Sequence, residues 1–141
     1  MRDRSSQHAL ILDDDVATAH LQRRCLERAG FRITCAHDVH VAMAAMQEAT
    51  FDVLVLDYNL TGYTGFDFLE MMAHAGLSVP VVMVSGWDDK TLATRARDAG
   101  VQKFVHKSGD YLAELPRAAL EAQKALAGHG GDCDNGGDYA R

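Results

Sequence analysis

Short apolar segments alternate with longer segments of helical period, and this alternation restricts the fold of the chain more than any other feature of the sequence. Three apolar segments are hydrophobic at every position: residues 9–12 (ALIL), 53–56 (VLVL) and 81–84 (VVMV). A strand is apolar throughout when both faces of its sheet are covered, as in a parallel sheet between helices. We therefore predict a doubly wound α/β fold in which these three strands are central.

The pattern predicts five strands joined by helices. The strands are expected at residues 9–12, 32–35, 52–56, 79–84 and 102–105. Asp38 and Asp88 can cap helix N-termini, and Gly30 suits the left-handed position after a helix that begins near residue 16. We expect Pro116 in the first turn of the last helix, where its missing N–H costs nothing, and residues 110–113 as a separate turn.

Length and charge exclude several classes of protein. The chain has 141 residues, enough for one domain, and 14 Lys and Arg against 20 Asp and Glu give a net charge of -6. An acidic surface repels a phosphate backbone, so we expect no direct nucleic-acid binding. No apolar run approaches the roughly 20 residues of a membrane helix, so we expect a cytoplasmic protein without membrane contact. We predict a domain over residues 8–127, between a disordered segment 1–7 and a flexible, Gly- and Asp-rich tail 128–141.

Polar side chains follow four of the five predicted strands. Asp13 and Asp14 follow the first strand, Asp57 the third, Ser85 the fourth and Lys107 the fifth. Carboxyl ends of parallel strands meet at one edge of the sheet, so these side chains should converge there. Two carboxylates repel by roughly 4 kcal/mol at about 4 Å and an effective dielectric of about 20, so the cluster needs cations. All-oxygen ligands favour Mg²⁺, and Lys107 supplies a second positive charge.

A site with a metal, an ammonium and a hydroxyl is suited to holding a phosphoryl group. Asp57 is the only carboxylate at the end of the predicted central strand, and carboxylates act as nucleophiles when an aspartyl phosphate forms. The loop after it, residues 58–64, leads to Gly65, and Gly62 and Gly65 permit positive φ angles and close backbone approach. We interpret Asp57 as the nucleophile.

Four segments occur in the order LILDDD, VLVLDYNLTGYTG, VVMVSG and FVHKS, and together they resemble the receiver domain of two-component response regulators, of the chemotaxis-regulator type. The resemblance covers residues 8–127. It implies a flavodoxin-like (βα)5 fold with strand order 2-1-3-4-5. It also implies phosphoryl transfer from the phosphohistidine of a sensor histidine kinase or a histidine phosphotransfer protein. Such a module is not an enzyme in the ordinary sense, although it takes part in its own phosphorylation and dephosphorylation.

The resemblance assigns roles to the residues at the strand ends. Asp57 is implied to be the phosphoacceptor, and Lys107 the lysine that pairs with the phosphoryl group. Asp14, Asp57 and the backbone carbonyl of Asn59 are implied to bind Mg²⁺, and Asp13 to act through metal-bound water. These assignments rest on the matching positions in the four segments.

Further residues are implied to transmit or time the signal. Ser85 is the switch hydroxyl and Phe104 the aromatic rotamer switch, and both are expected to move inward on phosphorylation. The surface of the fourth helix, fifth strand and fifth helix would then bind a downstream protein. We hypothesise that Asn59 and Trp87 set the lifetime of the aspartyl phosphate, because Trp87 borders the path of attacking water.

Two positions depart from the usual family pattern. Thr61 and Ser108 stand where the family commonly has proline, and the Lys107–Ser108 peptide bond is cis in many receivers. A non-proline cis bond costs about 3–4 kcal/mol, so the sequence leaves the isomer of this bond open.

Two other functions use some of the same residues. A small Mg²⁺-dependent phosphatase or phosphotransferase of the haloacid dehalogenase type also uses an aspartate nucleophile. That class usually carries Asp-x-Asp at its first strand, whereas here Asp57 is on the third strand and Asn59 replaces the second Asp. A receiver-shaped module that binds partners without phosphorylation is the second alternative. No motif in the sequence identifies the cognate kinase, the output partner or the oligomeric state.

Overall fold

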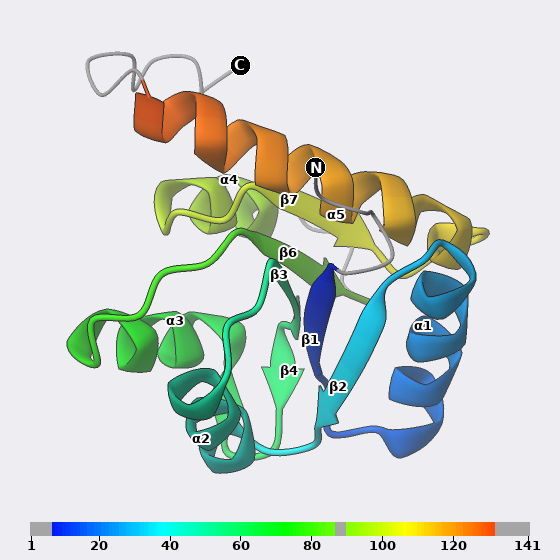
Figure 1. The fold of residues 1–141 in the computed structure, drawn as a ribbon, viewed down its shortest axis with the longest axis horizontal. Helices are drawn as coiled ribbons and strands as arrows, with labels where there is room; N and C mark the ends of the chain where they lie inside the picture. The colour runs from blue at the N-terminus through cyan, green and yellow to red at the C-terminus, as the bar shows by residue number, and fades with distance from the viewer. Residues whose placement is uncertain (1–6, 87–89, 132–141) are drawn as a thin grey trace.

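A five-stranded parallel sheet lies between two layers of helices (Figure 1) in the computed structural model, which describes residues 7–86 and 90–131. The strands of this sheet, in chain order, are β1 (His8–Leu12), β2 (Arg32–Ala36), β3 (Val53–Asp57), β6 (Val81–Ser85) and β7 (Lys103–His106). Their order in the sheet is β2-β1-β3-β6-β7, with every neighbouring pair parallel. This confirms the predicted order, with β6 and β7 as the fourth and fifth strands, and the three wholly apolar segments are the central strands.

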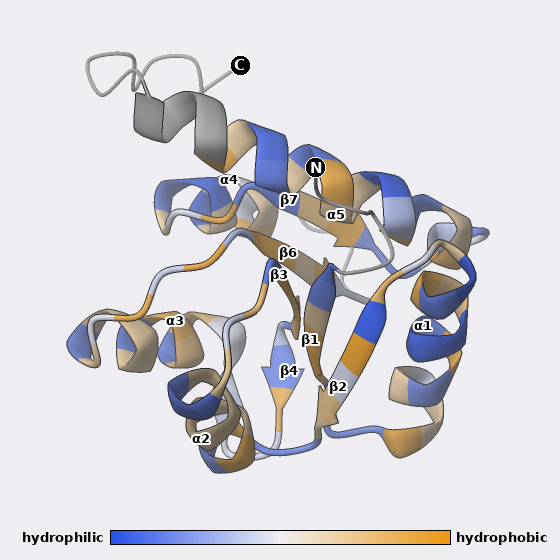
Figure 2. Cartoon of the chain, viewed as in Figure 1, coloured by the Kyte–Doolittle hydropathy of each residue, from blue (hydrophilic) through white to orange (hydrophobic). Residues whose placement is uncertain are grey.

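Helices cover both faces of the sheet. α1 (Val16–Arg28) and α5 (Tyr111–Gly131) pack on one face, and α2 (Val39–Glu48), α3 (Gly65–His74) and α4 (Lys90–Asp98) pack on the other. Alternate residues of each strand contribute to the two cores: Leu10 and Leu54 face α2, α3 and α4, whereas Ile11 and Val55 face α1 and α5. Figure 2 shows hydrophobic central strands surrounded by helices that carry both hydrophilic and hydrophobic residues. None of the described helices is both long and apolar enough to span a membrane.

Local capping signals read from the sequence are present where the structure describes them. The Asp38 side chain accepts hydrogen bonds from the backbone N–H groups of His40 and Val41 at the start of α2. Gly30 follows α1 with a φ of 101°, the left-handed conformation that glycine adopts at low cost. Asp88, the expected cap of α4, lies outside the described residues.

The predicted start of the last helix was wrong. α5 begins at Tyr111 and continues through Pro116, so residues 111–113 belong to the helix and do not form a separate turn. A proline in a helix removes the N–H that would bond the carbonyl four residues earlier, which here belongs to Leu112. The Cys25 thiol of α1 donates a hydrogen bond to that carbonyl oxygen, at 2.8 Å. A side chain from the neighbouring helix thus provides the donor that Pro116 lacks.

The loop after β3 contains a small hairpin that was not predicted from the sequence. β4 (Asn59–Leu60) pairs antiparallel with β5 (Tyr63–Thr64). Thr64 then caps α3: its hydroxyl accepts from the Asp67 N–H, and the Asp67 carboxylate accepts from the Thr64 N–H. The hairpin is therefore fixed at both ends, between the phosphoacceptor candidate Asp57 and the first turn of α3.

Candidate functional site

The polar residues at the strand ends converge at the carboxyl edge of the sheet. Asp57 is the last residue of β3, Asp13 and Asp14 follow β1, and β1 pairs with β3 so that Leu12 lies beside Leu56. One carboxylate oxygen from each of the three aspartates lies within 4.8 Å of the others. Asp13 is 1% exposed and Asp57 8% exposed, and Asp14 is partly buried. The predicted acidic cluster is therefore present and largely shielded from solvent.

Lys107 supplies a positive charge to this cluster. Its Nζ lies 3.3 Å from Asp57 Oδ1 and 3.4 Å from Asp13 Oδ2. The backbone directs the side chain there, because the Lys107 N–H donates to the carbonyl oxygen of Ser85, at 2.7 Å, and continues the pairing of β7 with β6. One ammonium opposite three carboxylates leaves two negative charges when all the groups are ionised, so the site is suited to a divalent cation.

The pKa of Asp57 is raised to about 6, first by burial and then by the negative charge of Asp13. The ion pair with Lys107 opposes this shift without cancelling it. Burial alone would lower the pKa of Lys107, but the Asp57 and Asp13 carboxylates outweigh burial and raise it, so the ammonium stays protonated. Asp57 is thus a carboxylate whose charge is disfavoured by its surroundings, as is frequent at functional sites.

The loop backbone approaches Asp57 closely. The Gly65 N–H donates to the carbonyl oxygen of Tyr58, at 2.7 Å. A Cβ on Gly65 would lie 3.1 Å from the backbone oxygen of Asp57 and 2.8 Å from the Met83 side chain. Gly62 has a φ of 79° in the hairpin turn. Both properties expected of this loop from its glycines, a positive φ angle and a close backbone approach, are present.

The other predicted site residues take different positions. Ser85 ends β6 and is 1% exposed. Asn59 is exposed at the start of β4, two residues after Asp57. Phe104 of β7 is partly buried against the core on the α2, α3 and α4 face. Trp87 lies outside the described residues.

Three site contacts were missed from the sequence. The Thr61 hydroxyl donates to Asp14 Oδ2, at 2.5 Å. The His37 ring contacts the backbone oxygen of Asp13 through Nδ1, at 3.0 Å. His106 contacts the Ser108 hydroxyl through Nδ1, at 2.9 Å. The peptide bond between Lys107 and Ser108, whose isomer the sequence left open, is trans. The only available signal was position, because each residue lies in or beside a loop at the carboxyl edge of the sheet.

The chemistry of the donors indicates which ions and ligands the site can hold. Three carboxylates offer hard oxygen ligands, which favour Mg²⁺ or a similar cation over zinc. The half-buried Lys107 and the buried Ser85 complete a group of residues that can hold an anion next to that cation.

A family model for the response regulator receiver domain matches residues 9–117 of the chain. The chain belongs to this family. The protein is therefore a signalling module of two-component systems. The acidic cluster lies inside the matched segment.

Several response regulators are similar to this receiver domain in sequence. Transcriptional regulatory protein FixJ of Bradyrhizobium diazoefficiens is 28% identical over 85% of this chain and 60% of its own length. Regulatory protein VirG of Rhizobium radiobacter is 31% identical over 83% of this chain and 45% of its own length. C4-dicarboxylate transport transcriptional regulatory protein DctD of Pseudomonas aeruginosa is 27% identical over 83% of this chain and 26% of its own length. The receiver domain thus spans between about a quarter and three fifths of these relatives.

Solved receiver structures share the fold. The receiver domain of the Francisella response regulator 1452 matches with a TM-score of 0.78 and 21% identity, over 86% of this chain and 99% of that one. The chemotaxis response regulator CheY4 of Vibrio cholerae matches with a TM-score of 0.70 and 24% identity, over 85% of this chain and 98% of that one.

Proposed function

We propose that this receiver domain accepts a phosphoryl group on Asp57 from the phosphohistidine of a sensor histidine kinase or a histidine phosphotransfer protein. The observation that carries the proposal is the convergence of Asp57 with Asp13, Asp14 and Lys107 at one end of the sheet. This arrangement combines a nucleophile, a site for a divalent cation and a fixed positive charge. We also propose that the domain is located in the cytoplasm, as expected from the sequence.

The transfer forms one bond and breaks another. A carboxylate oxygen of Asp57 attacks the phosphorus atom, the P–N bond breaks, and its electron pair returns to the imidazole nitrogen of the donor. With its pKa near 6, Asp57 is mainly ionised, and so nucleophilic, at neutral pH. Lys107 and the Ser85 hydroxyl are the groups that would contact the phosphoryl oxygens and stabilise their charge.

Mg²⁺ would be held by Asp14, Asp57 and the backbone carbonyl of Asn59, with Asp13 acting through a water molecule. When bound, the ion neutralises charge on the carboxylates and on the incoming phosphoryl group. The support for this cation is the all-oxygen donor set and the two negative charges that Lys107 leaves unbalanced.

A chain of ring contacts leads from Asp57 toward the proposed output surface. Tyr58, the next residue, packs edge-to-face on Phe66 of α3, with ring centroids 5.3 Å apart. The Arg95 guanidinium of α4 lies 4.8 Å from the centroid of the same Phe66 ring. Through these two contacts the residue that follows Asp57 is connected to α4, and we propose that phosphorylation alters the packing of α4 by this route.

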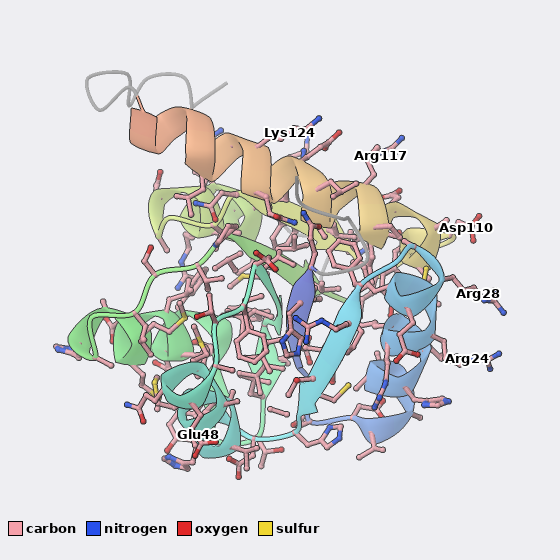
Figure 3. All side chains as sticks on the ribbon, in the orientation of Figure 1. Arg24, Arg28, Glu48, Asp110, Arg117 and Lys124 are labelled. Carbon is pink, nitrogen blue, oxygen red and sulfur yellow. The ribbon has the colours of Figure 1, made fainter. Side chains whose placement is uncertain are left out.

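The downstream partner is proposed to bind the face formed by α4, β7 and α5, where Phe104 would turn inward. An exposed ion pair between Lys103 of β7 and Glu121 of α5, 3.0 Å apart, lies on this face. Figure 3 shows Arg117 and Lys124 of α5 pointing away from the sheet. These charged side chains are available to a partner.

Asn59 and Trp87 remain the residues proposed to set the lifetime of the aspartyl phosphate. Asn59 is exposed and follows Asp57 by two residues, and we propose that it influences the approach of water. Loss of phosphate from Trp87→Ala, timed against the unchanged domain, tests this role. An altered half-life supports it, and an unchanged half-life contradicts it.

The central test is phosphorylation by acetyl phosphate with MgCl2, followed by intact-mass measurement. We expect one added phosphoryl group on the unchanged domain and none on Asp57→Asn. Asp110→Asn is a matched control, because Asp110 is exposed at the start of α5 (Figure 3) and should not affect labelling. Absence of labelling on the unchanged domain, or equal labelling of Asp57→Asn, would overturn the proposal.

A further inference from the structure

The turn of the β4–β5 hairpin contacts the acidic cluster through Thr61. The Thr61 Oγ1 donates to Asp14 Oδ2, at 2.5 Å, across 47 residues of sequence. The bond links the hairpin that follows β3 to the loop that follows β1. Both residues also line a pocket of about 140 Å³ beside the cluster, so water has access to this contact.

The conformation of the turn does not itself require threonine. Leu60 pairs with Tyr63, so Thr61 and Gly62 are the two central residues of the turn. Gly62 has a φ of 79°, as the second central residue of a type II turn does, and Thr61 does not have a positive φ. The first central position of such a turn accepts many residues and favours proline. The Thr61 hydroxyl is therefore additional to the needs of the turn.

The hydrogen bond leaves Asp14 directed at the cluster. With the bond formed, a carboxylate oxygen of Asp14 still lies within 4.8 Å of oxygens from Asp13 and Asp57. An ionised carboxylate has about four acceptor positions, so it can accept from a hydroxyl and bind a cation together. Hydrogen bonds to metal-ligating carboxylates fix their orientation and affect metal affinity.

We propose that Thr61 is a positioning residue for the metal site, holding Asp14 in the orientation that binds Mg²⁺. This inference rests on the metal site of the proposed function. Removal of the hydroxyl lets Asp14 rotate toward the open pocket, and the cation must then reorder it. The expected effect is about a tenfold increase in the dissociation constant for Mg²⁺, at the lower end of what loss of such contacts causes.

The test is isothermal titration of MgCl2 into the unchanged domain and three variants. Thr61→Val removes the hydroxyl and keeps the shape of the side chain, and we expect about tenfold weaker binding. Thr61→Pro also removes the hydroxyl but suits the turn, so it should bind as weakly as Thr61→Val. Thr61→Ser keeps the hydroxyl and should bind Mg²⁺ within about twofold of the unchanged domain. Urea unfolding without metal verifies that all four proteins are folded.

Weak binding by both Thr61→Val and Thr61→Pro, with rescue by Thr61→Ser, supports the inference. Binding by Thr61→Val that is as tight as, or tighter than, that of the unchanged domain overturns it, and so does weak binding by Thr61→Ser. Labelling by acetyl phosphate at saturating MgCl2 separates this inference from the proposed function. Absence of labelling on the unchanged domain would contradict the proposed function, whereas the affinities decide the role of Thr61.

Discussion

The Asp57 carboxylate is held where its charge is disfavoured. It is buried at the end of β3, close to Asp13, and Lys107 is its cationic partner, 3.3 Å away. Its pKa is raised from 3.8 to about 6, so the folded protein binds this proton more tightly than the unfolded chain does. Ionised Asp57 therefore lowers the stability of the metal-free protein at neutral pH.

We expect Asp57→Asn to be more stable than the unchanged domain at pH 7 in EDTA, by about 1 kcal/mol once solvent screening is allowed for. The stabilising protonated form of Asp57 is fully present below its unfolded pKa of 3.8 and is lost as the pH rises through about 6. The advantage of the variant should therefore be small near pH 4 and full at pH 7. Urea unfolding across this range measures it, and a variant that is less stable at pH 7 would contradict the prediction.

Gly65 is restricted by its distance from the Asp57 backbone. An added Cβ would meet the Asp57 backbone oxygen at 3.1 Å and the Met83 methyl group at 2.8 Å. We expect Gly65→Ala to lower the free energy of unfolding by about 1–3 kcal/mol and to slow acetyl phosphate labelling, because the loop must shift. Gly86→Ala is the control for stability, since a Cβ there meets nothing within 4 Å. A Gly65→Ala protein as stable as Gly86→Ala would refute this role.

Among the secondary-structure elements, α1 and α5 are joined by a contact that compensates for a proline. Pro116 lies inside α5 and leaves the Leu112 carbonyl without its helical donor, and the Cys25 thiol of α1 donates to it. Burial raises the pKa of Cys25, so the thiol keeps its proton and remains a donor at neutral pH.

A double-mutant cycle tests this link between α1 and α5. We expect Cys25→Ala to cost about 1 kcal/mol of unfolding free energy, because the Leu112 carbonyl loses its donor. In a Pro116→Ala background residue 116 supplies a backbone N–H, so the same Cys25→Ala change should cost less. Urea unfolding of the four proteins gives the coupling energy, and equal costs in both backgrounds would show that the two residues act independently.

At the scale of the whole molecule, two hydrophobic cores share one sheet. Phe68 of α3 lies in one core and Leu115 of α5 in the other, and both side chains are fully buried. Each central strand contributes alternate residues to both cores. Loss of either layer would therefore expose one face of the same strands, and we expect the cores to unfold together.

Phe68→Ala should lower the free energy of unfolding by about 3–5 kcal/mol and Leu115→Ala by about 2–5 kcal/mol. Both variants should keep a single unfolding transition. Circular dichroism measured in the far-ultraviolet, for helix, and in the near-ultraviolet, for aromatic packing, should give the same midpoint for each protein. Two separate midpoints would show that one layer unfolds independently of the other.

Much of the fold was predictable because burial on both faces of a parallel sheet leaves a local signal. Strands such as residues 53–56 must be apolar throughout, and this alone identified the central strands. The convergence of Asp13, Asp14, Asp57 and Lys107 followed from the rule that parallel strands end at one edge. By contrast, the continuation of α5 through Pro116 was not predictable, since it depends on a donor from another helix.

The sequence by itself determined the five strands of the parallel sheet, their helical cover and the residues that gather at its carboxyl edge, because hydrophobic periodicity and position at strand ends are local properties. Tertiary structure alone decided which side chains meet across the loops. Thr61 bonds to Asp14 across 47 residues, and Cys25 bonds to the Leu112 carbonyl across 87. Such contacts depend on the relative placement of loops and helices, which only packing around the completed sheet establishes.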